Sequence, residues 1–154
     1  MINLLDQLFK YNKAANLEYI HALESNANFP DRAHELMIHI LNAQEIWMDR
    51  LSPIAGKKSI LPWDRRNDIN KIELNSILYE RTEKFLKDNQ VEILSRKKIH
   101  YRTTKGDSFE NTVADILYHI INHATYHRGQ ISIYLRAKDT TPPNSDYIFY
   151  VREL

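Results

Sequence analysis

Apolar residues recur at three- and four-residue spacing over most of this chain. That period places them on one face of a helix, so it predicts long amphipathic helices over residues 3–24, 32–51, 70–88 and 112–138. Asn70 followed by Glu73 resembles a capping box at the start of the third helix. On the second helix, Glu45 and Asp49 are expected to point away from the apolar face. Four such helices predict an all-α fold in which the helices pack as an antiparallel four-helix bundle.

A short segment before the last long helix has a different period. Ile99, Tyr101 and Thr103 alternate with polar residues, and Gly106 with Asp107 is a turn signal before residues 108–111. Alternation with a period of two is typical of strands, so we expect a small β-hairpin there. Residues 145–154 are predicted to form a short helical tail.

Composition narrows the class of protein. The chain has 154 residues, 43% of them hydrophobic and 27% charged, which is typical of a single globular domain, here residues 1–154. With 21 Lys and Arg against 20 Asp and Glu, it lacks the cationic excess of a nucleic-acid binder. It has no cysteine, so a metal would be held by nitrogen and oxygen. No apolar run is long enough for a membrane span or a signal peptide, and we expect a soluble, cytoplasmic protein.

Candidate chemistry lies on the last long helix, where His119, His123 and His127 are four residues apart. Residues at this spacing share a helix face, so His123 and His127 can direct two imidazoles at one metal ion. A row of three such residues extends about 12 Å along the axis, too far for one ion. His119 is therefore expected to line the pocket. The alternative for buried histidines is a hydrogen-bonded polar core.

The second helix offers the third ligand. His39 falls on the same face as Leu36, Ala43 and Ile46, so it is expected to point into the bundle. Inward side chains of facing helices converge in a bundle, which would bring His39 to His123 and His127. Three imidazoles suit a divalent ion such as Zn, Ni or Fe and leave a coordination position open for water or substrate.

Other residues on the first and last helices are assigned supporting roles. Gln130 is expected near the ligands, orienting substrate or water or forming an interhelical hydrogen bond. Asn12 and Asn16 are candidates to hold a ligand imidazole. Arg128 is expected to turn away and form a salt bridge or a subunit contact. Gly129, costly inside a helix, predicts close packing.

These residues lie within segments that resemble the DinB/YfiT-like family. NHATYHRGQI (residues 122–131) looks like its C-terminal signature and HILNAQEIWMDRL (39–51) its second-helix motif. YNKAANLEYI (11–20) resembles its first-helix segment, although Lys13 or Ala14 replaces a common tryptophan. TPPNSDYIFYVRE (141–153) fits its tail. The resemblance covers nearly the whole chain.

The resemblance implies a four-helix bundle, often a homodimer, that binds a divalent metal through the positions of His39, His123 and His127. Members with assigned activities include transferases and isomerases that use bacillithiol or mycothiol, and others are described as metal-dependent hydrolases. We therefore expect a small-molecule substrate, with a low-molecular-weight thiol activated by the metal. The open alternatives are a hydrolase that uses water and a non-catalytic binding or dimerisation module.

Overall fold

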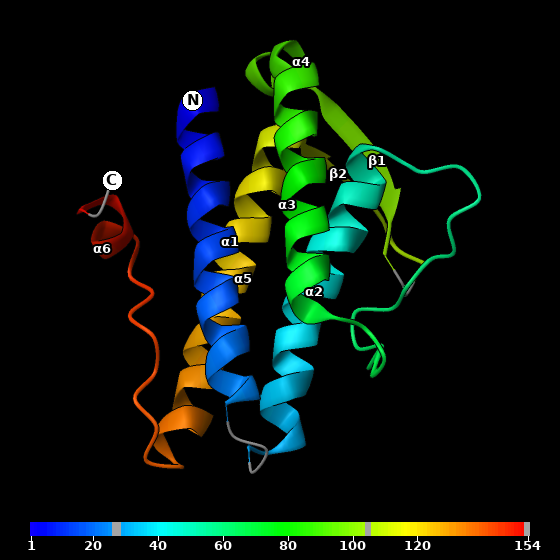
Figure 1. The fold of residues 1–154 in the computed structure, drawn as a ribbon. Coiled ribbons are helices and arrows are strands. Elements are labelled where there is room, and N and C mark those ends of the chain that lie inside the picture. Colours follow the sequence, from blue (N-terminus) through cyan, green and yellow to red (C-terminus); the bar gives the residue numbers. More distant parts are fainter. Residues whose placement is uncertain (26–28, 104–105, 153–154) are drawn as a thin grey trace.

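The computed structural model describes residues 1–25, 29–103 and 106–152 of the chain. Four long helices dominate it, namely α1 (Ile2–Glu24), α2 (Asp31–Leu51), α3 (Lys71–Asp88) and α5 (Val113–Arg136) (Figure 1). All four agree with the predicted helices to within about two residues at each end. The helical periodicity was thus sufficient to locate them. No helix within the described residues is long and apolar enough to span a membrane.

The helices form a ring in the order α1, α3, α2, α5, so that α2 and α5 pack side by side. Because α2 is followed by a long connection, residues 52–70, the chain returns to the other end of the bundle before α3 begins (Figure 1). As a result α2 and α3 run parallel, and so do α1 and α5. Among neighbours in the ring, the expected antiparallel arrangement therefore holds for the α2–α5 and α1–α3 pairs and not for the other two. A long crossover connection is the physical reason for the difference.

Local sequence signals explain where several elements begin. The Asn70 side chain accepts hydrogen bonds from the backbone N–H groups of Ile72 and Glu73 at 3.0 and 3.1 Å, which caps α3. Thr112 caps α5 by accepting from the Asp115 N–H at 3.1 Å. The predicted hairpin is present as β1 (Lys98–Arg102) and β2 (Ser108–Thr112), paired antiparallel. The short α4 (Gln90–Leu94) was not expected, since five residues are too few for a helical period to be read.

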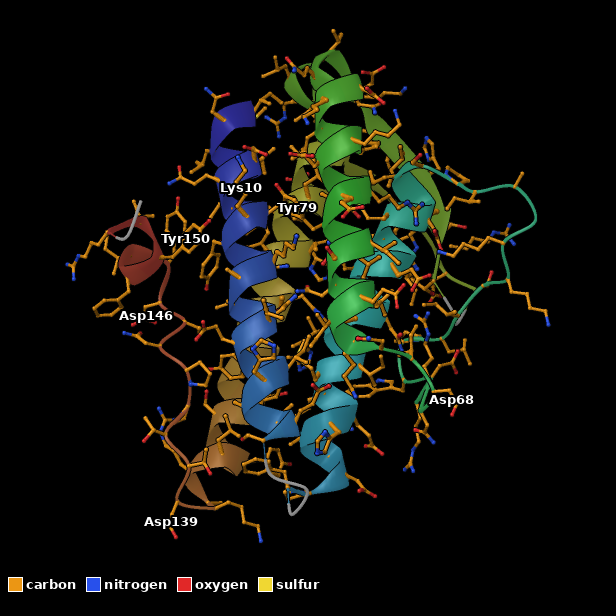
Figure 2. The ribbon with its side chains drawn as sticks, in the orientation of Figure 1. Lys10, Asp68, Tyr79, Asp139, Asp146 and Tyr150 are labelled. Carbon is orange, nitrogen blue, oxygen red and sulfur yellow. The ribbon has the colours of Figure 1, made fainter. Side chains whose placement is uncertain are left out.

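The C-terminal segment returns along the bundle and ends in α6 (Tyr147–Arg152). Figure 2 shows Asp146 and Tyr150 beside α1, on the side of the bundle opposite Asp68. The Tyr11 hydroxyl donates a hydrogen bond to the Ser145 carbonyl at 2.6 Å. The Tyr11 ring packs against the ring of Tyr147. The predicted helical tail is therefore confirmed up to residue 152, and residues 153–154 lie outside the described part.

Two apolar clusters fill the bundle, one toward each end. The first includes Tyr19, Leu41 and Ile131, and the second includes Phe9, Met48 and Leu117. Buried polar side chains occur on all four long helices. Asn12, Asn16, Gln44 and Thr82 fall between the two clusters along their helices, and His39, Asn75, His127 and Arg128 lie among members of the first cluster. A buried polar group costs free energy unless it has a partner, so these side chains are the candidates for a functional site.

Candidate metal centre

The α2–α5 contact brings three histidines together. His39 lies on α2, and His123 and His127 lie one turn apart on α5. One ring nitrogen from each histidine falls in a group whose members are all within 4.8 Å of one another. The helix spacing set the His123–His127 pair, and the antiparallel packing of α2 on α5 added His39 at their level.

Hydrogen bonds on the outer side of the rings fix their orientation. His39 Nδ1 lies 2.8 Å from the Pro62 carbonyl oxygen, which can only accept, so this nitrogen carries the proton. His127 Nδ1 likewise donates to Gln130 Oε1 at 2.7 Å. The Nε2 atoms of both rings then keep their lone pairs and can bind a cation. Metal-ligating histidines are held in the same way by a carbonyl or carboxylate on the far nitrogen.

The inner nitrogens face one another with few donors between them. His39 Nε2 and His123 Nε2 are 3.2 Å apart, so His123 supplies the proton of this hydrogen bond when no cation is present. A cation between the rings could instead accept a lone pair from each histidine. The donor set therefore fits a divalent transition metal, with three nitrogen ligands and at least one further position available in a tetrahedral shell.

Electrostatics keep the three rings neutral. Burial, together with the neighbouring His127, His39 and His119, lowers the pKa of His123 to about 3. Burial also lowers the pKa values of His39 and His127, against hydrogen bonds to Pro62 and Gln130 that raise them. Neutral imidazole is the form that ligates metals, so no proton has to leave a cationic ring before binding at neutral pH.

The loop between α2 and α3 covers one side of the histidines. The Trp63 ring stacks on His39 with a centroid distance of 3.7 Å and an interplanar angle of 5°. Trp63 is itself 47% exposed, so its ring separates His39 from the solvent. Asn42 anchors this loop by donating to the Asp64 carbonyl at 2.8 Å. The sequence could not have shown that Pro62 contributes to the site, because the group involved is a backbone carbonyl.

Glu45 also anchors the loop, although the sequence placed it on the outer face of the second helix. It is 7% exposed and pairs with Lys57 at 2.7 Å and Arg66 at 2.6 Å. Burial raises the pKa of the Glu45 carboxyl, but the hydrogen bonds from the two cations outweigh it and hold the pKa below its usual value. The sequence did not show that the long loop folds over this face of α2, buries Glu45 and supplies its partners.

His119 lies beside the centre without belonging to it. Its ring is 5.5 Å from the ring of His123 and packs edge-on against Trp47 at 5.1 Å, and the converging nitrogens do not include it. Burial lowers the pKa of His119, and the positive charge of Arg50 adds to the effect. The structure thus separates His119 from the other two histidines of α5, as the axial rise requires.

The structure corrects the roles expected of Asn12 and Asn16. Both side-chain oxygens accept from Arg128 Nη1 at 2.7 Å, so these oxygens are engaged away from the ligand imidazoles. Arg128 is fully buried and has no carboxylate partner among the described residues, so the expected salt bridge or subunit contact is also wrong. The cause is the parallel packing of α1 on α5, which encloses the guanidinium.

Gln130 lies beside the ligands, as expected, and forms its hydrogen bond within α5, to His127, where it orients a ring of the centre. Gly129 is exposed, and a Cβ built on it would meet nothing within 4 Å, so close packing inside the described chain does not explain this glycine.

Comparisons with known proteins agree with this arrangement. The model of the DinB family matches residues 1–153. Protein DinB of Bacillus subtilis (strain 168) is 23% identical over 161 residues, an alignment that covers 94% of this chain and 92% of that protein. The family match extends over α1, α2 and α5 and so includes all three histidines. On this evidence the chain belongs to the DinB family.

Proposed function

We propose that this protein is a metal-dependent enzyme that transfers a low-molecular-weight thiol to an electrophile. A divalent ion, Zn, Ni or Fe, would be held by His39, His123 and His127. The observation that carries the proposal is the convergence of three neutral imidazole nitrogens, two of them oriented from behind by Pro62 and Gln130. A structural polar core would supply a donor for each of these nitrogens, whereas the hydrogen bond between His39 and His123 supplies one proton.

The charges around the histidines favour a thiol as the nucleophile. Besides one another, the three rings have their pKa values lowered by Arg32 and His119, and no carboxylate of the described residues takes part in these shifts. When bound by three neutral ligands, the ion would supply its full positive charge to lower the pKa of a group at its open position. A thiol has a pKa of about 8.5 against about 15.7 for water, so it needs a far smaller shift and no carboxylate base.

The proposed reaction is a nucleophilic substitution by the thiol sulfur. The S–H proton passes to solvent, the sulfur forms a bond to the electrophilic carbon, and the leaving group departs with the electrons of its bond. The protein orients the rings of His39 and His127 through their outer nitrogens, and Trp63 covers the His39 ring against water. These contacts hold the donor nitrogens in place before substrate arrives.

The test compares conjugation with hydrolysis. Protein loaded with Zn, Ni or Fe would be incubated with cysteine and chlorodinitrobenzene, and separately with a nitrophenyl ester, both of which report by absorbance. We expect conjugation above the uncatalysed rate in the wild type and in His119→Ala, and none in the double variant His123→Ala/His127→Ala. Ester cleavage without conjugation would show that the nucleophile is water and not a thiol. No turnover on panels of thiols, electrophiles and esters would leave a metal-binding module.

The expected homodimer and the cytoplasmic location stay predictions. Sedimentation velocity on the purified protein would test the dimer directly.

A further inference from the structure

Arg50 is a cation that has no carboxylate partner in the described part of the chain. Its Cζ lies 4.2 Å from the centroid of the Trp47 ring and 4.6 Å from that of Tyr101. Its Nη2 reaches only a backbone oxygen, the Arg102 carbonyl, at 3.5 Å. Neither Arg50 nor Arg102 forms an ion pair with any acidic residue in the described ranges. Two neighbouring guanidinium groups thus retain unused donors.

Both arginines line a cavity of about 420 Å³ between α2, the 52–70 loop and the end of β1, which we call the Arg50 pocket. Ile46, Ile60 and Leu61 supply its apolar wall. The lining therefore combines an apolar surface with two cations, which is the chemistry that binds a small carboxylate with an apolar body.

One carboxylate does line the Arg50 pocket, but its oxygens are engaged elsewhere. Asp49 Oδ1 accepts from Lys57 Nζ at 2.8 Å and from Arg81 Nη1 at 2.6 Å, and Asp49 Oδ2 accepts from Lys57 at 2.8 Å. Asp49 thus pairs with Lys57 and Arg81 and leaves Arg50 and Arg102 for a ligand.

The position of Arg50 also carries a cost that a ligand would offset. The residue is half-buried, and burial lowers the pKa of its guanidinium below the ordinary value. The two aromatic rings compensate part of the lost hydration through cation–π contacts. A carboxylate can accept two parallel N–H bonds from one guanidinium, and such charge-assisted bonds are stronger than the single long bond to a carbonyl.

The Arg50 pocket adjoins the histidines by two routes. Trp47, on which Arg50 stacks, packs against His119 at 5.1 Å, and His119 is 5.5 Å from His123. Leu61, which lines the pocket, precedes Pro62, whose carbonyl holds His39. Arg50 follows His39 by eleven residues, about 16 Å along the α2 axis, of which the arginine side chain covers a part.

We propose that the Arg50 pocket binds the carboxylate end of an amphipathic substrate whose other end reaches the histidine centre. The placing of the reacting end rests on the proposed function, whereas binding of the carboxylate does not. The carboxylate belongs either to the thiol or to the electrophile, and competition kinetics separate these sources.

Binding is measured with hexanoate and its neutral analogue hexanamide, by following the Arg50 Nε–H signal in ¹⁵N NMR spectra of the wild type. We expect hexanoate to bind at least about tenfold more tightly than hexanamide. In Arg50→Gln, where calorimetry replaces the NMR readout, this preference should vanish. The matched variant Arg65→Gln, which alters a loop arginine outside the Arg50 pocket, should keep it. Equal binding of the two probes, or an unchanged preference in Arg50→Gln, would overturn the proposal.

A second variant covers the case in which Arg50→Gln disturbs the hairpin. Arg102 is exposed, so Arg102→Gln is expected to leave the fold intact and to weaken hexanoate binding by about two- to fivefold. No weakening would contradict the role of the guanidinium pair.

The proposed metal site and the Arg50 pocket can be tested separately. His123→Ala/His127→Ala should still bind hexanoate, since the Arg50 pocket contains neither residue. Hexanoate binding without any turnover would refute the proposed function and leave the subsite standing. In an active protein, competition of hexanoate with the thiol would show that the thiol carries the carboxylate. Competition of hexanoate with the electrophile would show that the electrophile carries it. Competition with neither reactant would overturn the link between the pocket and the reaction.

Discussion

His127 and Arg128 are consecutive residues on α5, yet their side chains enter polar clusters of opposite character. His127 turns toward α2, where it meets His39 and His123. Arg128 turns toward α1, where Nη1 donates to Asn12 and Asn16, and Nη2 donates to Thr125 at 2.9 Å and Tyr11 at 3.2 Å. Consecutive residues are about 100° apart on a helix, which is enough to assign them to different seams of the bundle.

The two clusters differ in what their polar atoms lack. Around Arg128, donors and acceptors are matched within the chain, and among the described residues only its Nε has no partner. Around the histidines, the outer nitrogens of His39 and His127 have partners, while the inner nitrogens of His39 and His123 share a single proton between two lone-pair sites. A cluster whose donors and acceptors are paired holds helices together, whereas ring nitrogens that converge with too few protons between them can bind a cation. The distinction predicts which changes should affect metal and which should affect stability.

The largest expected effect is on metal content. The double substitution His123→Ala/His127→Ala removes two of three donors, and we expect elemental analysis after dialysis to find no retained Zn or Ni. His119→Ala is the matched control on the same helix and should retain the ion. Retention by the double variant would mean that the converging nitrogens are not the site.

Arg128→Ala should act on stability instead. It leaves a cavity and deprives Asn12 and Asn16 of their donor, so we expect the free energy of unfolding in urea to fall by about 3 kcal/mol. Arg136→Ala, an exposed change near the end of α5, should cost less than about 0.5 kcal/mol. Metal content per folded molecule should be unchanged in both variants. A parallel loss of metal in Arg128→Ala would show that the clusters are not independent.

Gln130→Ala should weaken the centre without removing a ligand. The His127 ring loses the acceptor that orients it, and losses of this kind reduce metal affinity by about 10- to 100-fold. Competition with a chromogenic chelator measures the dissociation constant. Gln130→Glu keeps an acceptor at the same position and should bind at least as tightly as the wild type.

Acidification should destabilise the metal-free protein. The pKa of His123 is lowered to about 3 by burial and by the neighbouring histidines, against an ordinary 6.5. Between these pKa values the His123 side chain is protonated in the unfolded chain but not in the folded chain. The free energy of unfolding therefore decreases as the pH is lowered. We expect a loss of about 1–2 kcal/mol between about pH 7 and pH 5 from this residue. Urea unfolding at both pH values checks it, and a slope unchanged in His123→Ala would refute the assignment.

The sequence by itself determined the local features. The helical period located α1, α2, α3 and α5, and the four-residue spacing set His123 and His127 on one face. The alternating period and Gly106 located the hairpin. These features depend on neighbours within about one turn or one strand pair, so side-chain type and spacing are sufficient to specify them. The apolar face of the second helix also indicated that His39 points inward.

Only the tertiary structure decided the rest. The course of residues 52–70 makes α2 and α3 parallel, buries Glu45 and brings the Pro62 carbonyl to His39. The packing of α1 on α5 gives Asn12 and Asn16 to Arg128 rather than to the imidazoles. Such contacts join segments far apart in the chain. A backbone carbonyl is present at every residue, so its role in the site cannot be predicted from residue type. What a histidine or an arginine does here is therefore set by which helix lies opposite.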